Sequence, residues 1–344
     1  MAARRTSKQL DREMRERCRD AWAAGELLVP LSHSEARSMR GRVEDGSLVC
    51  PYPRIFDEPE HWQALSAREK NLHVARTLQG QMPEAVFCAE SAAVALGTYE
   101  PPGLLRPVVA TSEKAHSRST RYLERMVVPQ GSVSLVEGIR VPSAERVAFD
   151  CARRLGFRRG LGVCDATLRR FAMTREGLER CFSETGRARG VADARRCARH
   201  ANALSENGGE SYARAAMIDL GFAEPALQVK VMDPLDGASS YRLDYLWTPS
   251  GLDVERLIWG LATGVLCAGD AAGCIAGELD GRSKTFDERL RAGRSAQDQL
   301  LLERRREARI TWYGIRVVRF SYWEASDDAY FSRLLAGYGV PRVQ

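Results

Sequence analysis

Acidic residues in the last third of the chain have the spacing of a cation site. The segment from Cys274 to Asp280 is a short apolar run that ends in Glu278 and Asp280, two residues apart. Residues two apart on a β-strand point to the same face, so both carboxylates would leave one side of a sheet. Adjacent negative charges repel each other unless a cation or a proton lies between them. The spacing therefore predicts a bound cation.

Two carboxylates further upstream extend this predicted site. Asp244 lies in the middle of Tyr241 to Trp247, an alternating aromatic and aliphatic run that is typical of a strand. Glu210 falls in the first turn of a helix that begins near Gly209. Oxygen ligands of this kind suit Mg²⁺ or Mn²⁺. The alternative is a set of surface carboxylates paired with arginines, but the apolar neighbours of Asp244 favour the metal.

Composition and charge describe a globular chain of more than one domain. The chain has 344 residues, of which 44% are hydrophobic and 28% charged, and this length predicts two or three domains. The net charge is +6, and arginine outnumbers lysine and clusters at particular places. Such clusters indicate either a polyanionic partner or an arginine-rich solvated surface, and composition by itself favours the surface.

Cysteine usage and hydropathy predict a cytoplasmic protein. The nine cysteines include no C-x-x-C pair and lie in apolar patterns, which is typical of reduced, buried thiols. The first 20 residues are charged throughout and lack the apolar core of a signal peptide. The longest apolar run, Leu257 to Ala268, is too short to span a bilayer. We therefore expect no membrane partner.

Residues 1–58 have the element order of a winged helix-turn-helix. A helix from Ser7 to Ala24 is followed by a capping box that starts at Ser32, a second helix, and an extended arm from Leu48 to Phe56. In this order the second helix supplies phosphate or base contacts to DNA. The alternative is a small helical cap with a charged surface. The candidate DNA contacts are Arg37, Arg40 and Arg42.

Residues 65–204 alternate helices with short β-type runs and predict a middle α+β domain. This region contains no catalytic constellation, and its isolated histidines, His73 and His116, are expected to be structural or on the surface. Residues 207–344 read as helix, hairpin, strand, long helix, strand and helix. We therefore expect a multidomain α/β protein whose third domain contains a mixed sheet, with an inserted helix in Gly251 to Gly273.

The third domain has a characteristic order of short segments. They are Gly209-Glu210-Ser211, Tyr241 to Trp247, Gly277 to Lys284, Glu303 to Glu307 and Gly314 to Phe320. In this order they resemble the PD-(D/E)XK nuclease fold, and specifically its very-short-patch-repair-endonuclease-like branch, over about residues 207–322. The preceding chain, from Leu65 through Phe149 to Arg153, is similar to AbiEi-type antitoxins, which join a winged helix to a second small domain.

The nuclease resemblance implies roles for particular residues. Asp244 matches the central metal-binding acid, Glu278 the second acid and Glu210 the helix acid. Asp280 stands where the general pattern has lysine, and either Asp280 or Glu210 would complete the metal shell. Lys284 would orient water or stabilise the pentavalent phosphate. The insertion between Asp244 and Glu278 departs from the pattern, and it would disrupt the site if it held the two strands apart.

Three hypotheses follow from these observations. The first is an Mg²⁺-dependent DNA endonuclease without an organic cofactor. The second is a non-catalytic antitoxin-type regulator that binds operator DNA and a toxin protein, and the third is a protein-interaction module without nucleic acid. Convergence of the three acids at Glu210, Asp244 and Glu278 would favour the nuclease, and separation would favour the regulator. In the nuclease, the residues that follow the DNA phosphates would be Arg304, Arg305, Arg316 and Arg319.

Overall fold

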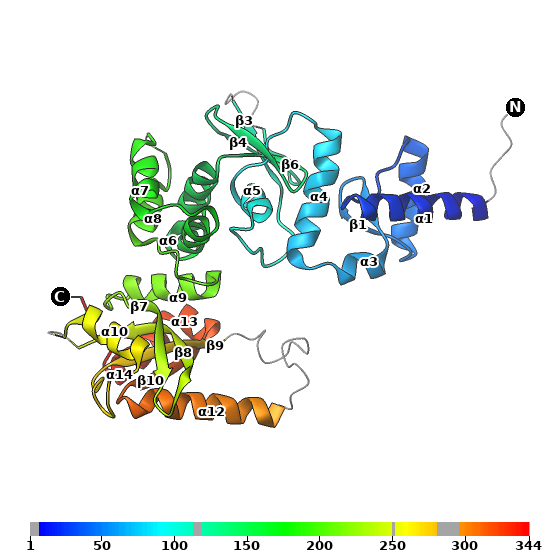
Figure 1. Ribbon diagram of the computed structural model, residues 1–344. Helices are drawn as coiled ribbons and strands as arrows, with labels where there is room; N and C mark the ends of the chain where they lie inside the picture. The colour runs from blue at the N-terminus through cyan, green and yellow to red at the C-terminus, as the bar shows by residue number, and fades with distance from the viewer. Residues whose placement is uncertain (1–6, 113–117, 187, 250–251, 281–295, 344) are drawn as a thin grey trace, which may run out of the picture. The chain divides into compact units, whose positions relative to one another are not determined.

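The computed structural model of the protein describes residues 7–112, 118–186, 188–249, 252–280 and 296–343. These residues form thirteen helices and ten strands, which are labelled in Figure 1. The chain divides into two compact units. Unit 1 comprises residues 1–154 and 180–189, and unit 2 comprises residues 155–179 and 190–344.

Unit 1 begins with two helices and a hairpin. Helix α1 (Ser7–Ala23) and helix α2 (His33–Glu44) precede the antiparallel strands β1 (Val49–Tyr52) and β2 (Ile55–Asp57). An isolated bridge pairs Leu28 with Phe56. The predicted order of helix, helix and β-hairpin is therefore present, whereas its assignment as a winged helix stays a prediction. The buried residues that hold these elements together are Cys18, Leu28, Met39, Leu48 and Phe56.

The rest of unit 1 is a mixture of helices and short strand pairs. Strand β3 pairs in parallel with β4, and β5 forms an antiparallel hairpin with β6. Helix α6 (Ala144–Phe171) begins in unit 1, and its residues from 155 onward belong to unit 2. It is interrupted at Gly156, where φ is 73°, a value that glycine adopts readily. The other elements are α3 (Pro59–Ala64), α4 (Ala67–Gln81), α5 (Ala89–Leu96), β3 (Val108–Thr111), β4 (Glu124–Val127), β5 (Val133–Val136) and β6 (Ile139–Pro142).

Unit 2 contains a four-stranded mixed sheet in the order β10-β9-β8-β7. Strand β10 is parallel to β9, and the other neighbours are antiparallel. The predicted mixed sheet of the C-terminal part is therefore confirmed. The strands are β7 (Ala226–Asp233), β8 (Asp236–Trp247), β9 (Ile275–Asp280) and β10 (Arg316–Ser321). The helices after α6 are α7 (Arg175–Glu184), α8 (Val191–His200), α9 (Gly208–Asp219), α10 (Val254–Thr263), α12 (Ala296–Trp312), α13 (Tyr322–Ser326) and α14 (Asp328–Tyr338).

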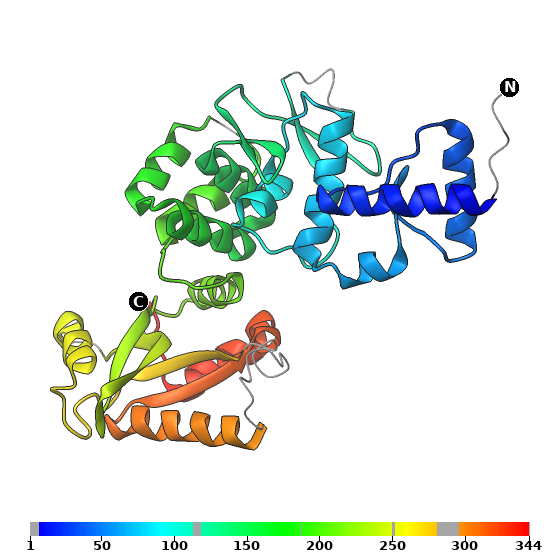
Figure 2. The same cartoon turned by 45° about the vertical axis from the view of Figure 1, so that its right-hand side comes forward.

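Helices cover both faces of this sheet. Tyr245 and Phe320 pack on one face with residues of α9, α13 and α14. Leu246 and Ala276 pack on the other face with residues of α10 and α12, and Figure 2 shows α12 running alongside the strands. Two buried faces explain why β9 is apolar almost throughout rather than alternating. Among the described residues, no helix has the length and apolar character needed to cross a membrane.

Candidate functional site

The structure places Asp244 and Glu278 on adjacent strands. The register pairs Tyr245 with Gly277 and Trp247 with Ile275 in antiparallel β8 and β9. The backbone N–H of Leu279 donates a 2.9 Å hydrogen bond to Oδ2 of Asp244. The segment between the two strands therefore does not hold them apart.

Glu210 is fixed at the start of α9 by hydrogen bonds to its carboxylate. The side chain is 4% exposed. Its carboxylate accepts hydrogen bonds from the backbone N–H of Glu206 at 2.7 Å, from Nδ2 of Asn207 at 2.6 Å and from Nε2 of Gln228 at 3.2 Å. The hydroxyl of Tyr245 on β8 donates to the backbone carbonyl of Glu210 at 2.8 Å. These contacts join the start of α9 to β7 and β8.

Asp244 acts electrostatically on both other acids. Burial raises the pKa of the Glu210 carboxyl, and the negative charge of Asp244 raises it further. Burial likewise raises the pKa of Glu278 to about 7, against the opposing effect of Arg306, and Asp244 again contributes. Buried acids with raised pKa values next to another acid are more frequent at functional sites than elsewhere. The three residues therefore form an electrostatically coupled acidic cluster.

The two acids at the end of β9 are each paired with an arginine. The guanidinium of Arg306 on α12 donates two 2.9 Å hydrogen bonds to the Glu278 carboxylate. Arg319 on β10 contacts Asp280 at 2.6 Å and lies 3.9 Å from Glu303. The ion-paired alternative is thus present for Glu278 and Asp280. In the described ranges, no group of three or more His, Cys, Asp or Glu side chains could hold a metal.

The remaining predicted residues of unit 2 are exposed or lie outside the described part of the chain. Arg304 and Arg305 are exposed on α12, and Arg316 is exposed at the start of β10. Lys284 lies outside the described residues. Sequence reasoning missed Arg306, although one signal was available. Arg306 is four residues before the buried Ile310, so both lie on the helix face toward the sheet.

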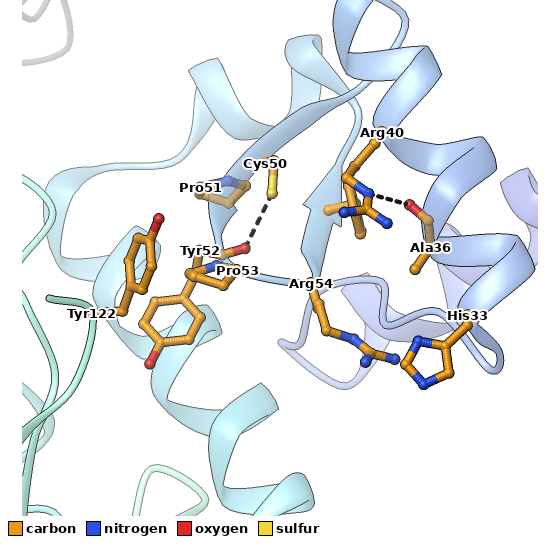
Figure 3. Close-up of a pocket in the computed structure, with 10 residues that line it drawn as sticks. His33, Ala36, Arg40, Cys50, Pro51, Tyr52, Pro53, Arg54 and Tyr122 are labelled. Carbon is orange, nitrogen blue, oxygen red and sulfur yellow. Dashed lines mark hydrogen bonds between the residues drawn. The ribbon is translucent and has the colours of Figure 1, made fainter. Parts of the chain in front are cut away.

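A second candidate site lies between α2 and the β1–β2 hairpin of unit 1. Of the predicted DNA contacts, Arg37 and Arg40 are exposed and Arg42 is partly buried. A cavity of about 450 Å³ opens beside Arg40. Figure 3 shows that residues of α2, of the hairpin and Tyr122 surround it. Its polar and aromatic lining residues are His33, Arg40, Tyr52, Arg54 and Tyr122.

Comparison with known proteins places part of this chain in a described family. Residues 85–197 match the AbiEi antitoxin C-terminal domain, which confirms the antitoxin-like part of the predicted resemblance. The uncharacterized protein MT2308 of Mycobacterium tuberculosis strain CDC 1551 / Oshkosh is 30% identical over 218 residues, 62% of this chain and 75% of its own length. The uncharacterized protein Rv2248 of strain ATCC 25618 / H37Rv gives the same identity and coverage. No solved structure matches the chain significantly. The chain belongs to the family of these mycobacterial proteins, and its residues 85–197 resemble the AbiEi antitoxin C-terminal domain.

Proposed function

We propose that the protein is a DNA-binding regulator of the AbiEi antitoxin type that also binds a toxin protein. The similarity of residues 85–197 to the AbiEi antitoxin C-terminal domain supports this class of function. The observation that carries DNA binding is the unneutralised charge beside α2. In the described part of the chain, neither Arg40 nor Arg54 has a carboxylate partner. Guanidinium groups that are not paired with a carboxylate are available to DNA phosphates.

Binding to duplex DNA at several salt concentrations tests the proposal. Each phosphate contact contributes a slope of about −0.9 to log K against log [salt]. Arg37→Ala and Arg40→Ala are each expected to weaken binding and to reduce the slope by about 1. Arg12→Ala is the matched control, because Arg12 is exposed on α1 and already paired with Glu16. Absence of DNA binding by the wild type at low salt would leave the protein-interaction module as the better hypothesis.

A second candidate is Mg²⁺- or Mn²⁺-dependent hydrolysis of DNA at the acidic cluster. The specific observation is a buried carboxyl, Glu278, whose pKa is raised to about 7 and which faces the charge of Asp244. Carboxylate oxygens are the ligands that Mg²⁺ prefers. Within the described ranges, however, no three such side chains are placed to hold a metal, so Glu278 and Asp280 would first have to be released by Arg306 and Arg319. The ion would polarise the phosphodiester and acidify a bound water. In this proposal residues 207–344 form a PD-(D/E)XK-type nuclease domain. It follows two further domains, at residues 1–58 and 65–204.

The chain's own residues define what this reaction would need. Arg306 must release at least one Glu278 oxygen to the cation, because its guanidinium donates hydrogen bonds to both oxygens. Asp244 must stay charged, and Glu210 keeps α9 against β7 and β8 through its contact with Gln228. The exposed Arg304, Arg305, Arg316 and partly buried Arg319 are the available phosphate contacts.

Nicking of supercoiled plasmid in Mg²⁺ or Mn²⁺ tests the second candidate. Asp244→Asn is expected to abolish nicking, whereas Glu303→Gln, an exposed acid on α12, is expected to retain it. Nicking that survives in Asp244→Asn would place the activity elsewhere. Salt-sensitive DNA binding without nicking would favour the regulator.

A further inference from the structure

The cavity in unit 1 has two chemically different ends. Its volume of about 450 Å³ lies within the range of small-molecule pockets. Figure 3 shows the side chains of Arg54 and His33 pointing toward one another at one end, with Arg40 nearby. The rings of Tyr52 and Tyr122 gather at the other end. One end therefore suits an anion and the other suits a flat aromatic group.

The aromatic end provides a stacking surface within a positive field. The rings of Tyr52 and Tyr122 meet edge to face, with centroids 6.0 Å apart. The guanidinium of Arg121 lies 4.6 Å from the centre of the Tyr122 ring. Burial raises the pKa of the Tyr52 phenol, against the opposing charges of Arg125 and Arg106, so this ring is neutral at physiological pH. A planar base can stack on one tyrosine and meet the edge of the other.

The cationic end is built from two different elements. His33 and Arg40 come from α2, which Ser32 caps at its N-terminus. Arg54 comes from the two-residue turn of the hairpin, between the paired residues Tyr52 and Ile55. Its φ is 61°, in the left-handed region that favours glycine. An arginine in this conformation has a backbone cost that glycine would avoid, and such strained positions are more frequent at functional sites than elsewhere.

We propose that this cavity binds a single nucleotide unit, with the base on Tyr52 and Tyr122 and the phosphate on Arg40 and Arg54. The chemical class is a nucleoside monophosphate. Two sources supply it: a base turned out of a DNA duplex, or a free nucleotide. The DNA source rests on the proposed function, because α2 and the hairpin must then lie against the duplex. None of the described residues that line the cavity is acidic, which agrees with an anionic ligand.

Binding of full-length protein to two fluorescent duplexes, one fully paired and one with a single unpaired base, tests the DNA source. We expect at least tenfold tighter binding to the duplex with the unpaired base, since each stacked base adds substantially to affinity. Tyr52→Ala and Tyr122→Ala should remove this preference while leaving affinity for paired DNA within twofold. Arg37→Ala is the matched control, because Arg37 is on α2 but does not line the cavity. Arg37→Ala should weaken binding to both duplexes by the same factor.

Competition with free adenosine and thymidine monophosphates tests the other source. Displacement of either duplex by micromolar nucleotide, with loss of displacement in Arg54→Gly, would identify a free nucleotide as the ligand. Glycine suits the turn at position 54, so this variant should fold and lose only the guanidinium. The inference is overturned if neither an unpaired base nor a free nucleotide is preferred in a protein that binds paired DNA. If the wild type binds no DNA, direct titration with a fluorescent nucleoside monophosphate decides: binding means that the proposed function fails and the cavity assignment stands, and absence of binding overturns both.

Discussion

Arg306 and Glu278 form a two-point ion pair between α12 and β9, with both hydrogen bonds 2.9 Å long. The same Arg306 guanidinium donates to the backbone carbonyl of Arg242 at 2.7 Å, and so joins α12 to β8 as well. Glu278 is 5% exposed, and this burial raises the pKa of its carboxyl. The positive charge of Arg306 acts in the opposite direction and lowers that pKa. Because this pair occupies both Glu278 oxygens, a cation at the proposed site would have to compete with Arg306 for them.

The first prediction concerns stability against pH. Because the folded-state pKa of Glu278, about 7, is above its ordinary value of 4.5, its contribution to stability is full below pH 4.5 and lost as pH rises through 7. At 1.36 kcal/mol per pKa unit the loss is about 3 kcal/mol. Glu278→Gln cannot titrate and should lack this loss. Urea unfolding at several pH values measures it, with Glu303→Gln as an exposed control. Parallel pH profiles for wild type and Glu278→Gln would contradict the prediction.

The second prediction concerns metal binding. Since Arg306 bonds both Glu278 oxygens, Arg306→Gln should bind Mn²⁺ roughly tenfold more tightly than wild type, about 1.4 kcal/mol. Affinity should also rise as pH passes through 7, because a ligating carboxyl must lose its proton. Isothermal titration calorimetry measures both effects. Arg305→Gln is the matched control, because it removes the same charge from an exposed position of α12. Equal Mn²⁺ affinities in the two variants would exclude competition by Arg306.

The third prediction concerns the buried ion pair of unit 2. Arg214 is fully buried and donates to Asp165 at 2.8 and 2.9 Å. Arg214→Met leaves the Asp165 charge buried without its partner, which typically costs about 3–5 kcal/mol. Asp328→Asn breaks the pair of Arg158 with the exposed Asp328 and should cost less than about 1 kcal/mol. Thermal unfolding of the full chain compares the two variants. Equal losses of stability would mean that burial does not make the Arg214–Asp165 pair more costly to break than an exposed pair.

The fourth prediction concerns the close approach of β9 to β8. A Cβ atom at Gly277 would lie 3.0 Å from the Trp247 ring and 3.1 Å from the Tyr245 ring. Both rings are buried, so Gly277→Ala should destabilise unit 2 by about 1–3 kcal/mol. Gly237→Ala, where a Cβ meets no atom within 4 Å, should change stability by less than about 0.5 kcal/mol. Chemical unfolding distinguishes them, and an unaffected Gly277→Ala would show that the rings can move aside.

Local patterns in the sequence determined much of the secondary structure. The alternation in Tyr241 to Trp247 and the apolar run after Cys274 predicted the strands that became β8 and β9. The capping box at Ser32 predicted the start of α2, where the Ser32 side chain accepts a hydrogen bond from the backbone N–H of Glu35. These signals are readable because a strand buries residues at a period of two, and a cap satisfies backbone groups within four residues. The same reasoning identified Glu210, Asp244 and Glu278 as candidates.

Only the tertiary structure decided how these residues are paired. Helical periodicity could place Arg306 on the inward face of α12. It could not name Glu278 as the partner, because the contact spans 28 positions. The cavity of unit 1 likewise joins Arg54 to Tyr122, which comes from a segment outside the predicted winged helix. The sequence by itself determined element types and candidate acids, because these depend on neighbouring residues. Strand register, ion-pair partners and cavity walls depend on packing between distant segments, and therefore required the fold.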